Sequence, residues 1–175
     1  MPRLKRYVPF EQSYNQADRG LRYNILLLGP AGSGRSSFVN CALTLLDPEG
    51  FILNRAAVGG NLRNNTRILK RYPLPGLEVS LWDMWGITND NFQYTRAILP
   101  TLLEGRLPSG WPLGEAPQQH QKELFHNTDS RTSRRIHCMI VFVPSRLLVH
   151  REASEGQLAS LRELIHIASA IGMCD

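Results

Sequence analysis

The hydrophobic pattern of the chain alternates between short apolar runs and amphipathic stretches. Uncharged apolar runs at 25–28 and 136–143 predict buried strands, and the run at 25–28 fits a strand buried on both faces, as in the middle of a parallel sheet. Apolar residues recur at helical spacing in 36–46 and 154–170, which predicts two helices. Buried strands that alternate with amphipathic helices are typical of an α/β fold.

The middle of the chain adds a hairpin and a third helix. Strands are predicted at 67–72 and 77–82, and the Pro/Gly turn at 73–76 joins them as an antiparallel pair. The apolar residues of 92–103 fit a helix that Pro100 should kink or break. Together these elements predict a mainly parallel sheet of about four strands with one antiparallel pair at its edge.

Two stretches fall outside this pattern. Residues 1–22 are polar and mixed, and we expect them to form an N-terminal lead-in to a domain at 23–175. Residues 104–135 are rich in Pro, Gly, Gln and Arg and lack periodicity. They predict a surface insertion that could bind a protein partner.

Composition limits the class of protein. With 175 residues, 42% hydrophobic and 20% charged, the chain can form one domain with a real core. No apolar run approaches the length of a transmembrane helix, so no membrane span is expected. The net charge of +5 could attract nucleotides, but basic and aromatic residues do not alternate, so we expect no nucleic-acid binding.

The cysteines indicate a reduced, intracellular compartment. Cys41, Cys138 and Cys174 are odd in number, far apart in sequence and form no C-x-x-C pair. Because Cys41 and Cys138 lie within apolar patterns, we expect them to be small buried hydrophobic residues.

The stretch between the first strand and the first helix has the spacing of a phosphate-binding loop. The four fixed positions of the motif G-x-x-x-x-G-K-[ST] are occupied by Gly29, Gly34, Arg35 and Ser36. Glycines at 29, 32 and 34 would let backbone N–H groups converge on an anion, beside the positive end of the helix. The alternative is a glycine turn that binds nothing.

We expect Mg²⁺ to accompany GTP or GDP at this loop. The Ser36 hydroxyl would be a direct ligand, and Asp83 of the D-x-x-G at 83–86 would hold the ion through water. Thr66 is a weaker candidate for sensing the ion and could equally begin a strand. The candidate nucleotide-binding residues are Gly29, Gly32, Ser33, Gly34, Arg35, Ser36, Ser37 and Gly86, whose N–H would reach the γ-phosphate.

The residues at positions 35 and 87 leave open whether the protein hydrolyses GTP. Arg35 stands where the motif has lysine, and arginine keeps the charge but is bulkier and planar. Ile87 stands where several GTPases have a glutamine that orients the attacking water, and isoleucine cannot bind water. Any GTP hydrolysis should therefore be slow.

With these motifs in place, the chain resembles the interferon-induced 44-like family of GTPase-like proteins. The resemblance covers about residues 24–175 and is carried by L-L-L-G-P-A-G-S-G-R-S-S-F-V-N (26–40), A-V-G-G-N (57–61), W-D-M-W-G-I (82–87) and R-I-H-C-M-I-V-F-V (135–143). It implies a Ras-like, three-layer P-loop domain that binds guanine nucleotide. It also implies a cytoplasmic location and a part in interferon or immune responses.

The chain also departs from the pattern of this family. The family usually has lysine at position 35, and its threonine-rich switch is replaced here by residues 61–66. Its guanine-reading [NT]-K-x-D element would follow Asp175, so we expect a domain truncated before its last strands. The prediction is purine-nucleotide binding, with GTP favoured by resemblance. The alternative is a nucleotide-independent interaction module derived from a GTPase, while an ATP-dependent phosphotransferase would need a second acidic motif that the sequence lacks.

Overall fold

A computed structural model describes residues 23–52, 54–56, 68–113, 132–149 and 151–172. They form a mixed α/β fold with a four-stranded, mostly parallel sheet and four helices. The predicted lead-in and Cys174 lie outside the described residues.

The sheet is built around its first strand. Its strands are β1 (Tyr23–Leu28), β2 (Lys70–Pro73), β3 (Val79–Asp83) and β4 (Cys138–Val141). In the order β2-β3-β1-β4, β1 pairs in parallel with β3 and β4, and β2 pairs antiparallel with β3. This confirms the predicted four strands with one antiparallel pair at the edge.

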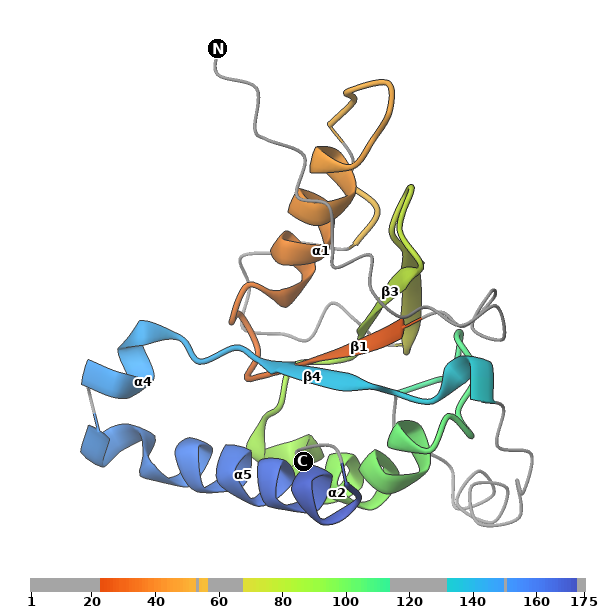
Figure 1. The fold of residues 1–175 in the computed structure, drawn as a ribbon. Helices are drawn as coiled ribbons and strands as arrows, with labels where there is room; N and C mark the ends of the chain where they lie inside the picture. The colour runs from red at the N-terminus through yellow and green to blue at the C-terminus, as the bar shows by residue number, and fades with distance from the viewer. Residues whose placement is uncertain (1–22, 53, 57–67, 114–131, 150, 173–175) are drawn as a thin grey trace.

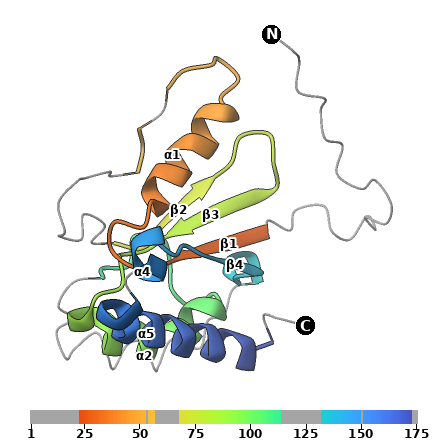
Figure 2. The same cartoon turned by 90° about the vertical axis from the view of Figure 1, so that its left-hand side faces the viewer.

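The helices cover both faces of the sheet. They are α1 (Arg35–Leu45), α2 (Asn89–Leu103), α4 (Ser145–Val149) and α5 (Arg151–Ala170), and a 3-10 turn, η2, spans Thr132–Arg134. Figures 1 and 2 show α1 on one face of the sheet, with α2 and α5 side by side on the other. No helix among the described residues combines the length and apolar character needed to cross a membrane.

The alternating direction of the side chains along β1 explains why helices lie on both faces of the sheet. Leu26 and Leu28 are fully buried in a large cluster with residues of α2 and α5. Leu27 points the other way, into a smaller cluster with Val39 and Leu43 of α1. Successive side chains of a strand point to opposite faces, so an all-apolar strand requires a cover on each side.

The predicted hairpin is present, with a shorter first strand. The Leu74 N–H donates to the Val79 carbonyl at 2.9 Å, and Gly76 has a φ of 69° in the turn. β2 begins at Lys70, whereas Ile68 forms an isolated bridge with Pro112.

The sequence predicted that Pro100 would kink or break its helix, and α2 does not break at this residue. The helix continues to Leu103, and the Pro100 carbonyl accepts the Glu104 N–H at 3.0 Å. Pro100 lies in the last turn, where its missing N–H removes one intrahelical hydrogen bond without ending the helix.

The segment predicted as a surface insertion is packed at its start. Leu107 and Leu113 are fully buried, and the Leu69 N–H donates to the Trp111 carbonyl at 2.8 Å. The part of 104–135 that the structure describes before residue 114 therefore belongs to the core. Residues 114–131 lie outside the described part of the chain.

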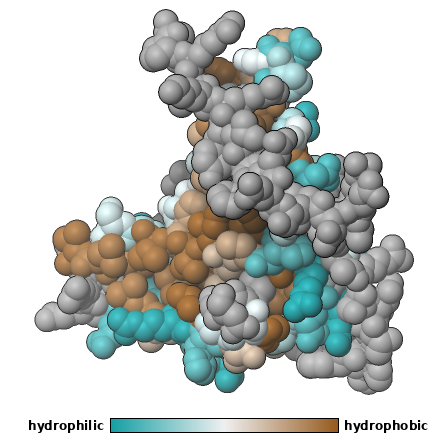
Figure 3. Space-filling model, in the orientation of Figure 1, coloured by the Kyte–Doolittle hydropathy of each residue, from teal (hydrophilic) through white to brown (hydrophobic). Residues whose placement is uncertain are grey.

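The prediction that 136–143 is a buried strand is correct only in part, because β4 covers 138–141 and its residues are exposed or half-buried. Its neighbour on one side is β1, and Val143 just after it is 41% exposed. In α4, which was not predicted, Leu148 and Val149 are 56% and 74% exposed. Figure 3 shows hydrophobic residues gathered on the surface around β4 and α4.

The predicted burial of two cysteines is also wrong. Cys41 and Cys138 are free and exposed. The buried positions of α1 are Arg35, Val39, Asn40 and Leu43, which share one side of the helix, so the exposed Cys41 points away from the sheet. Cys138 is exposed at the beginning of the edge strand.

Candidate functional site

The loop between β1 and α1, residues 29–34, is here called the glycine loop. Gly32 and Gly34 have φ values of 74° and 94°, in the left-handed region that favours glycine. The Ser33 N–H donates to the Pro30 carbonyl at 3.2 Å and closes a tight turn. The sequence thus folds this segment into a compact turn that leads directly into α1.

The beginning of α1 is open to an anion. Gly34 is the N-cap, no side chain caps the helix, and its first turn holds no acidic residue. The first N–H groups of a helix have no intrahelical partner and carry a partial positive charge. Ser36 and the exposed Ser37 lie in this first turn.

The D-x-x-G segment runs against the glycine loop. The Ile87 N–H donates to the Gly29 carbonyl at 3.0 Å, and the Ala31 N–H donates to the Ile87 carbonyl at 3.3 Å. A Cβ on Gly86 would lie 2.3 Å from the Ala31 Cα, and one on Gly29 would lie 2.5 Å from the Phe142 carbonyl oxygen. Both glycines are therefore required by close packing of the backbone.

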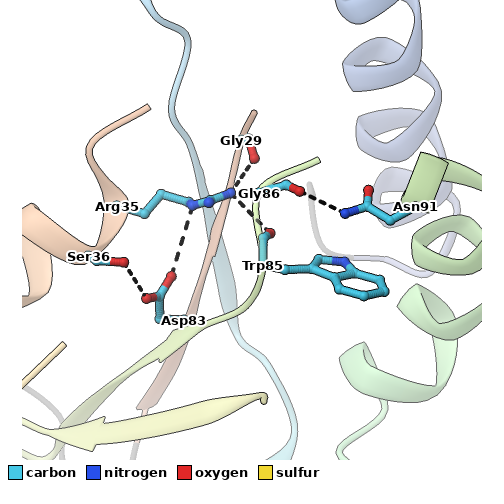
Figure 4. A network of polar contacts seen from close by, with 7 residues as sticks. All are labelled: Gly29, Arg35, Ser36, Asp83, Trp85, Gly86 and Asn91. Atoms are coloured by element: carbon cyan, nitrogen blue, oxygen red, sulfur yellow. Dashed lines mark hydrogen bonds and ion pairs between the residues drawn. The ribbon is translucent and has the colours of Figure 1, made fainter. Parts of the chain in front are cut away.

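The two strongest candidates for Mg²⁺ ligation lie together. The Ser36 Oγ donates to Asp83 Oδ2 at 2.8 Å, although the two residues are far apart in the chain (Figure 4). Asp83 ends β3 and Ser36 follows β1, and these strands are parallel neighbours whose carboxyl ends meet at one edge. Asp83 is only 1% exposed.

Arg35 points into the protein instead of toward solvent. Its side chain is 6% exposed, and its Nη1 donates to the Gly29 carbonyl and, at 3.3 Å, to the Trp85 carbonyl. Its Nε lies 3.9 Å from Asp83 Oδ1. Figure 4 shows this side chain bridging the glycine loop and the D-x-x-G segment.

The buried pair perturbs both of its members. Burial lowers the pKa of Arg35, and the charge of Asp83 opposes this change. Burial raises the pKa of Asp83, against the Ser36 hydrogen bond and the charge of Arg35. Each charge therefore depends on the other, because a lone charge at this depth would be strongly destabilising.

Three polar atoms near the loop are buried without a hydrogen-bond partner among the described residues. They are Ser33 Oγ, Arg35 Nε and Asp83 Oδ1. Arg35 Nε and Asp83 Oδ1 face each other at 3.9 Å. The Ser33 hydroxyl suits a phosphate oxygen and the Asp83 carboxylate suits a hydrated cation, so these two residues fit a Mg²⁺–phosphate group at the loop.

A metal here would need ligands from outside the protein. The described part of the chain contains no group of three or more His, Cys, Asp or Glu side chains that could hold a metal. Mg²⁺ commonly takes one or two protein ligands and fills its shell with water and substrate phosphates. Ser36 and Asp83 are compatible with that pattern.

Arg146 was not among the predicted site residues. It lies in α4, and its Nη2 donates to the Ala31 carbonyl of the glycine loop at 3.4 Å. One signal could have found it: Arg146 closely follows β4, a parallel neighbour of β1, so it comes to the same edge of the sheet as the glycine loop.

A second polar cluster is structural. Asn24 is fully buried, and its Nδ2 donates to the Ser133 and Arg135 carbonyls at 3.0 and 2.9 Å. Its Oδ1 accepts the Trp82 Nε1–H at 2.9 Å. The amide thus ties β1 to β3 and to the segment before β4 and has no open donor or acceptor group for a ligand.

Comparisons of the chain with protein-family models, with curated proteins and with solved structures found no match. The resemblance to the interferon-induced 44-like family therefore stays a prediction from short motifs. The motif at 57–61 and Thr66 lie outside the described residues. The motifs at 26–40, 82–87 and 135–143 come together at β1, β3 and β4.

Proposed function

We propose that the glycine loop, Ser36 and Asp83 bind a purine nucleotide as its Mg²⁺ complex. The observation that carries this proposal is the 2.8 Å contact between the Ser36 hydroxyl and the Asp83 carboxylate beside the glycine loop. A hydroxyl, a carboxylate and converging N–H groups form the combination that phosphate-binding loops use.

Each residue has a separate task in this proposal. The loop and the open end of α1 offer backbone N–H groups to phosphate oxygens, and the buried Ser33 hydroxyl gains the partner that it lacks. Ser36 and Asp83 would hold Mg²⁺, which neutralises phosphate charge when bound. Ile87 offers an attacking water no side-chain partner, so we expect slow hydrolysis or none.

The preference for GTP and the biological role come from resemblance. Three motifs that resemble the interferon-induced 44-like family lie in the described sheet and loop, which supports membership of that family. On that basis we propose a Ras-like P-loop domain that binds guanine nucleotide in the cytoplasm and acts in interferon or immune responses.

A nucleotide-independent interaction module is the second candidate. The observation that favours it is Arg35, whose guanidinium is committed to Gly29, Trp85 and Asp83. A loop whose cation points inward can be a remnant of a nucleotide site that now serves only to hold the fold together.

A titration separates the two candidates. Labelled GTP, GDP and ATP are added to the protein with Mg²⁺ or with a chelator. The proposal predicts micromolar or tighter binding, about −8 kcal/mol, that weakens at least about tenfold without Mg²⁺ or in Ser36→Ala. Ser169→Ala on α5, which also removes a serine hydroxyl, is the matched control and should bind normally.

Failure of binding has two forms. If the wild-type protein binds no nucleotide and Arg35→Lys does, the arginine blocks the site and the second candidate is correct. If neither binds, nucleotide binding by these residues is wrong.

A further inference from the structure

We propose that Arg146 of α4 supplies the cation that contacts the phosphates of the bound nucleotide, while Arg35 serves the fold. The inference rests on the proposed nucleotide binding. It assigns the positive charge that contacts the phosphates to Arg146, which lies outside the loop motif. It would make the phosphate site a product of two segments, the glycine loop and α4.

The charge of Arg35 is already neutralised within the protein. Its side chain is 6% exposed, and its guanidinium donates to two backbone carbonyls and faces Asp83 at 3.9 Å. Swinging it toward a ligand would break its bonds to the Gly29 and Trp85 carbonyls and leave both carbonyls without that donor in the protein interior. Arg35 is therefore poorly placed to provide the charge that lysine provides in this motif.

Arg146 has the opposite environment. It is exposed, and its Nη2 is held at the glycine loop by the Ala31 carbonyl at 3.4 Å. None of the ion pairs among the described residues engages it with a carboxylate. A guanidinium has five N–H donors, so this single contact leaves donors open for a ligand at the loop.

The contact also positions Arg146. Because the acceptor is a backbone carbonyl, the arginine is aligned with the loop itself and not with a particular side chain. β4 carries α4 to the edge of the sheet where β1 ends, so the helix and the loop share that edge. Arginine suits the task because its planar fork can bond two phosphate oxygens at once.

The test uses mant-GTP with Mg²⁺ and four proteins. These are the wild-type protein, Arg146→Ala, Arg146→Lys and Arg162→Ala. Arg162 is exposed on α5, so its loss changes the net charge equally and serves as the matched control. We expect about tenfold or more weaker binding in Arg146→Ala, an intermediate value in Arg146→Lys and normal binding in Arg162→Ala, with unchanged melting temperatures.

Inorganic tripolyphosphate, used as a competitor, shows which part of the nucleotide Arg146 contacts. A phosphate contact predicts that Arg146→Ala weakens tripolyphosphate and mant-GTP to the same degree. A loss for mant-GTP alone would move the contact to the base or sugar and overturn the inference.

The inference and the proposed function fail in different ways. Normal binding by Arg146→Ala overturns the inference and leaves nucleotide binding intact. Absence of binding by the wild-type protein overturns both.

Discussion

The Arg35–Asp83 pair concentrates two opposite charges in the interior of the domain. Both side chains are almost fully buried, and together they join the glycine loop to the end of β3. Removing one member of a buried ion pair costs far more than removing both, since the remaining charge has no partner.

We therefore predict that Arg35→Met destabilises the protein by about 3–5 kcal/mol. The double variant Arg35→Met with Asp83→Asn should recover part of this loss, because no lone charge remains. Urea unfolding measures both values, and Arg162→Ala gives the effect of an exposed arginine. Additive losses in the double variant would contradict a coupled pair.

His137 makes stability depend on pH. Its Nδ1 accepts the Asn24 backbone N–H at 3.0 Å, which requires an unprotonated Nδ1. Partial burial of its ring, and then the charge of Arg135, lowers the pKa of His137 below its ordinary 6.5. The unfolded chain then binds the proton more readily, so stability is full above about pH 6.5 and falls as pH drops through the lowered pKa.

The His137→Asn variant tests this dependence, since the amide oxygen can accept the same N–H without titrating. Between pH 7.5 and about 5, the wild-type protein should lose more stability than the variant. His166→Asn on the exposed face of α5 should retain the wild-type pH dependence. Parallel pH profiles for the wild-type protein and His137→Asn would exclude His137 as the cause.

At the scale of elements, two glycines in different settings should respond oppositely to a methyl group. Gly86 lies against Ala31, and an added Cβ would come within 2.3 Å of its Cα. Gly156 lies inside α5, and beyond the neighbouring backbone of its own helix no atom lies within 4 Å of an added Cβ. One glycine allows two elements to touch, whereas the other only weakens a helix.

Gly86→Ala should therefore destabilise by about 1–3 kcal/mol or more, because the D-x-x-G segment must move away from the loop. Gly156→Ala should stabilise by about 0.5–1 kcal/mol through helix propensity. Thermal unfolding of both variants shows whether each substitution lowers or raises the stability of the protein. A stable Gly86→Ala protein would mean that the loop and the segment can separate freely.

The elements that could be predicted are those set by local pattern. The four leucine and isoleucine residues of 25–28, the Pro/Gly turn of the hairpin and the helical periodicity of α1 each predicted their element correctly. The approach of Ser36 to Asp83 also followed, because it needs only two parallel strands with residues at their carboxyl ends.

The elements that could not be predicted depend on contacts between distant parts of the chain. Burial of Leu107 and Leu113 depends on the pairing of Leu69 with Trp111, which no local pattern encodes. The exposure of Cys138 depends on which residues of its strand other elements cover, and an apolar run does not specify this. The inward turn of Arg35 depends on carbonyls of Gly29 and Trp85, which a residue motif does not specify.

At the scale of the whole molecule, the two faces of the sheet differ in the size of their cores. The face toward α2 and α5 holds the larger hydrophobic cluster, with Leu26, Trp82 and Leu99 fully buried. The face toward α1 holds a much smaller cluster around Val39 and Leu43. Less apolar area is thus removed from water under α1.

We predict that α1 and the glycine loop open more easily than α2 and α5. In native-state hydrogen exchange, amides of α1 should exchange at a lower opening free energy than those of α2. Nucleotide with Mg²⁺ should then protect α1 selectively, since a ligand that binds the closed loop stabilises it by mass action. Equal opening free energies for the amides of α1 and α2 without ligand would contradict this prediction.

The central position of β1 also affects how the chain is made. β1 is synthesised early, but both of its neighbours, β3 and β4, leave the ribosome later, and Leu26, Leu27 and Leu28 have no sheet to join until then. At about 5–20 residues per second, the strand waits on the order of ten seconds for β4. During translation the newly made chain therefore exposes three leucines that are fully buried in the folded protein, so conditions that keep newly made chains apart should raise its yield.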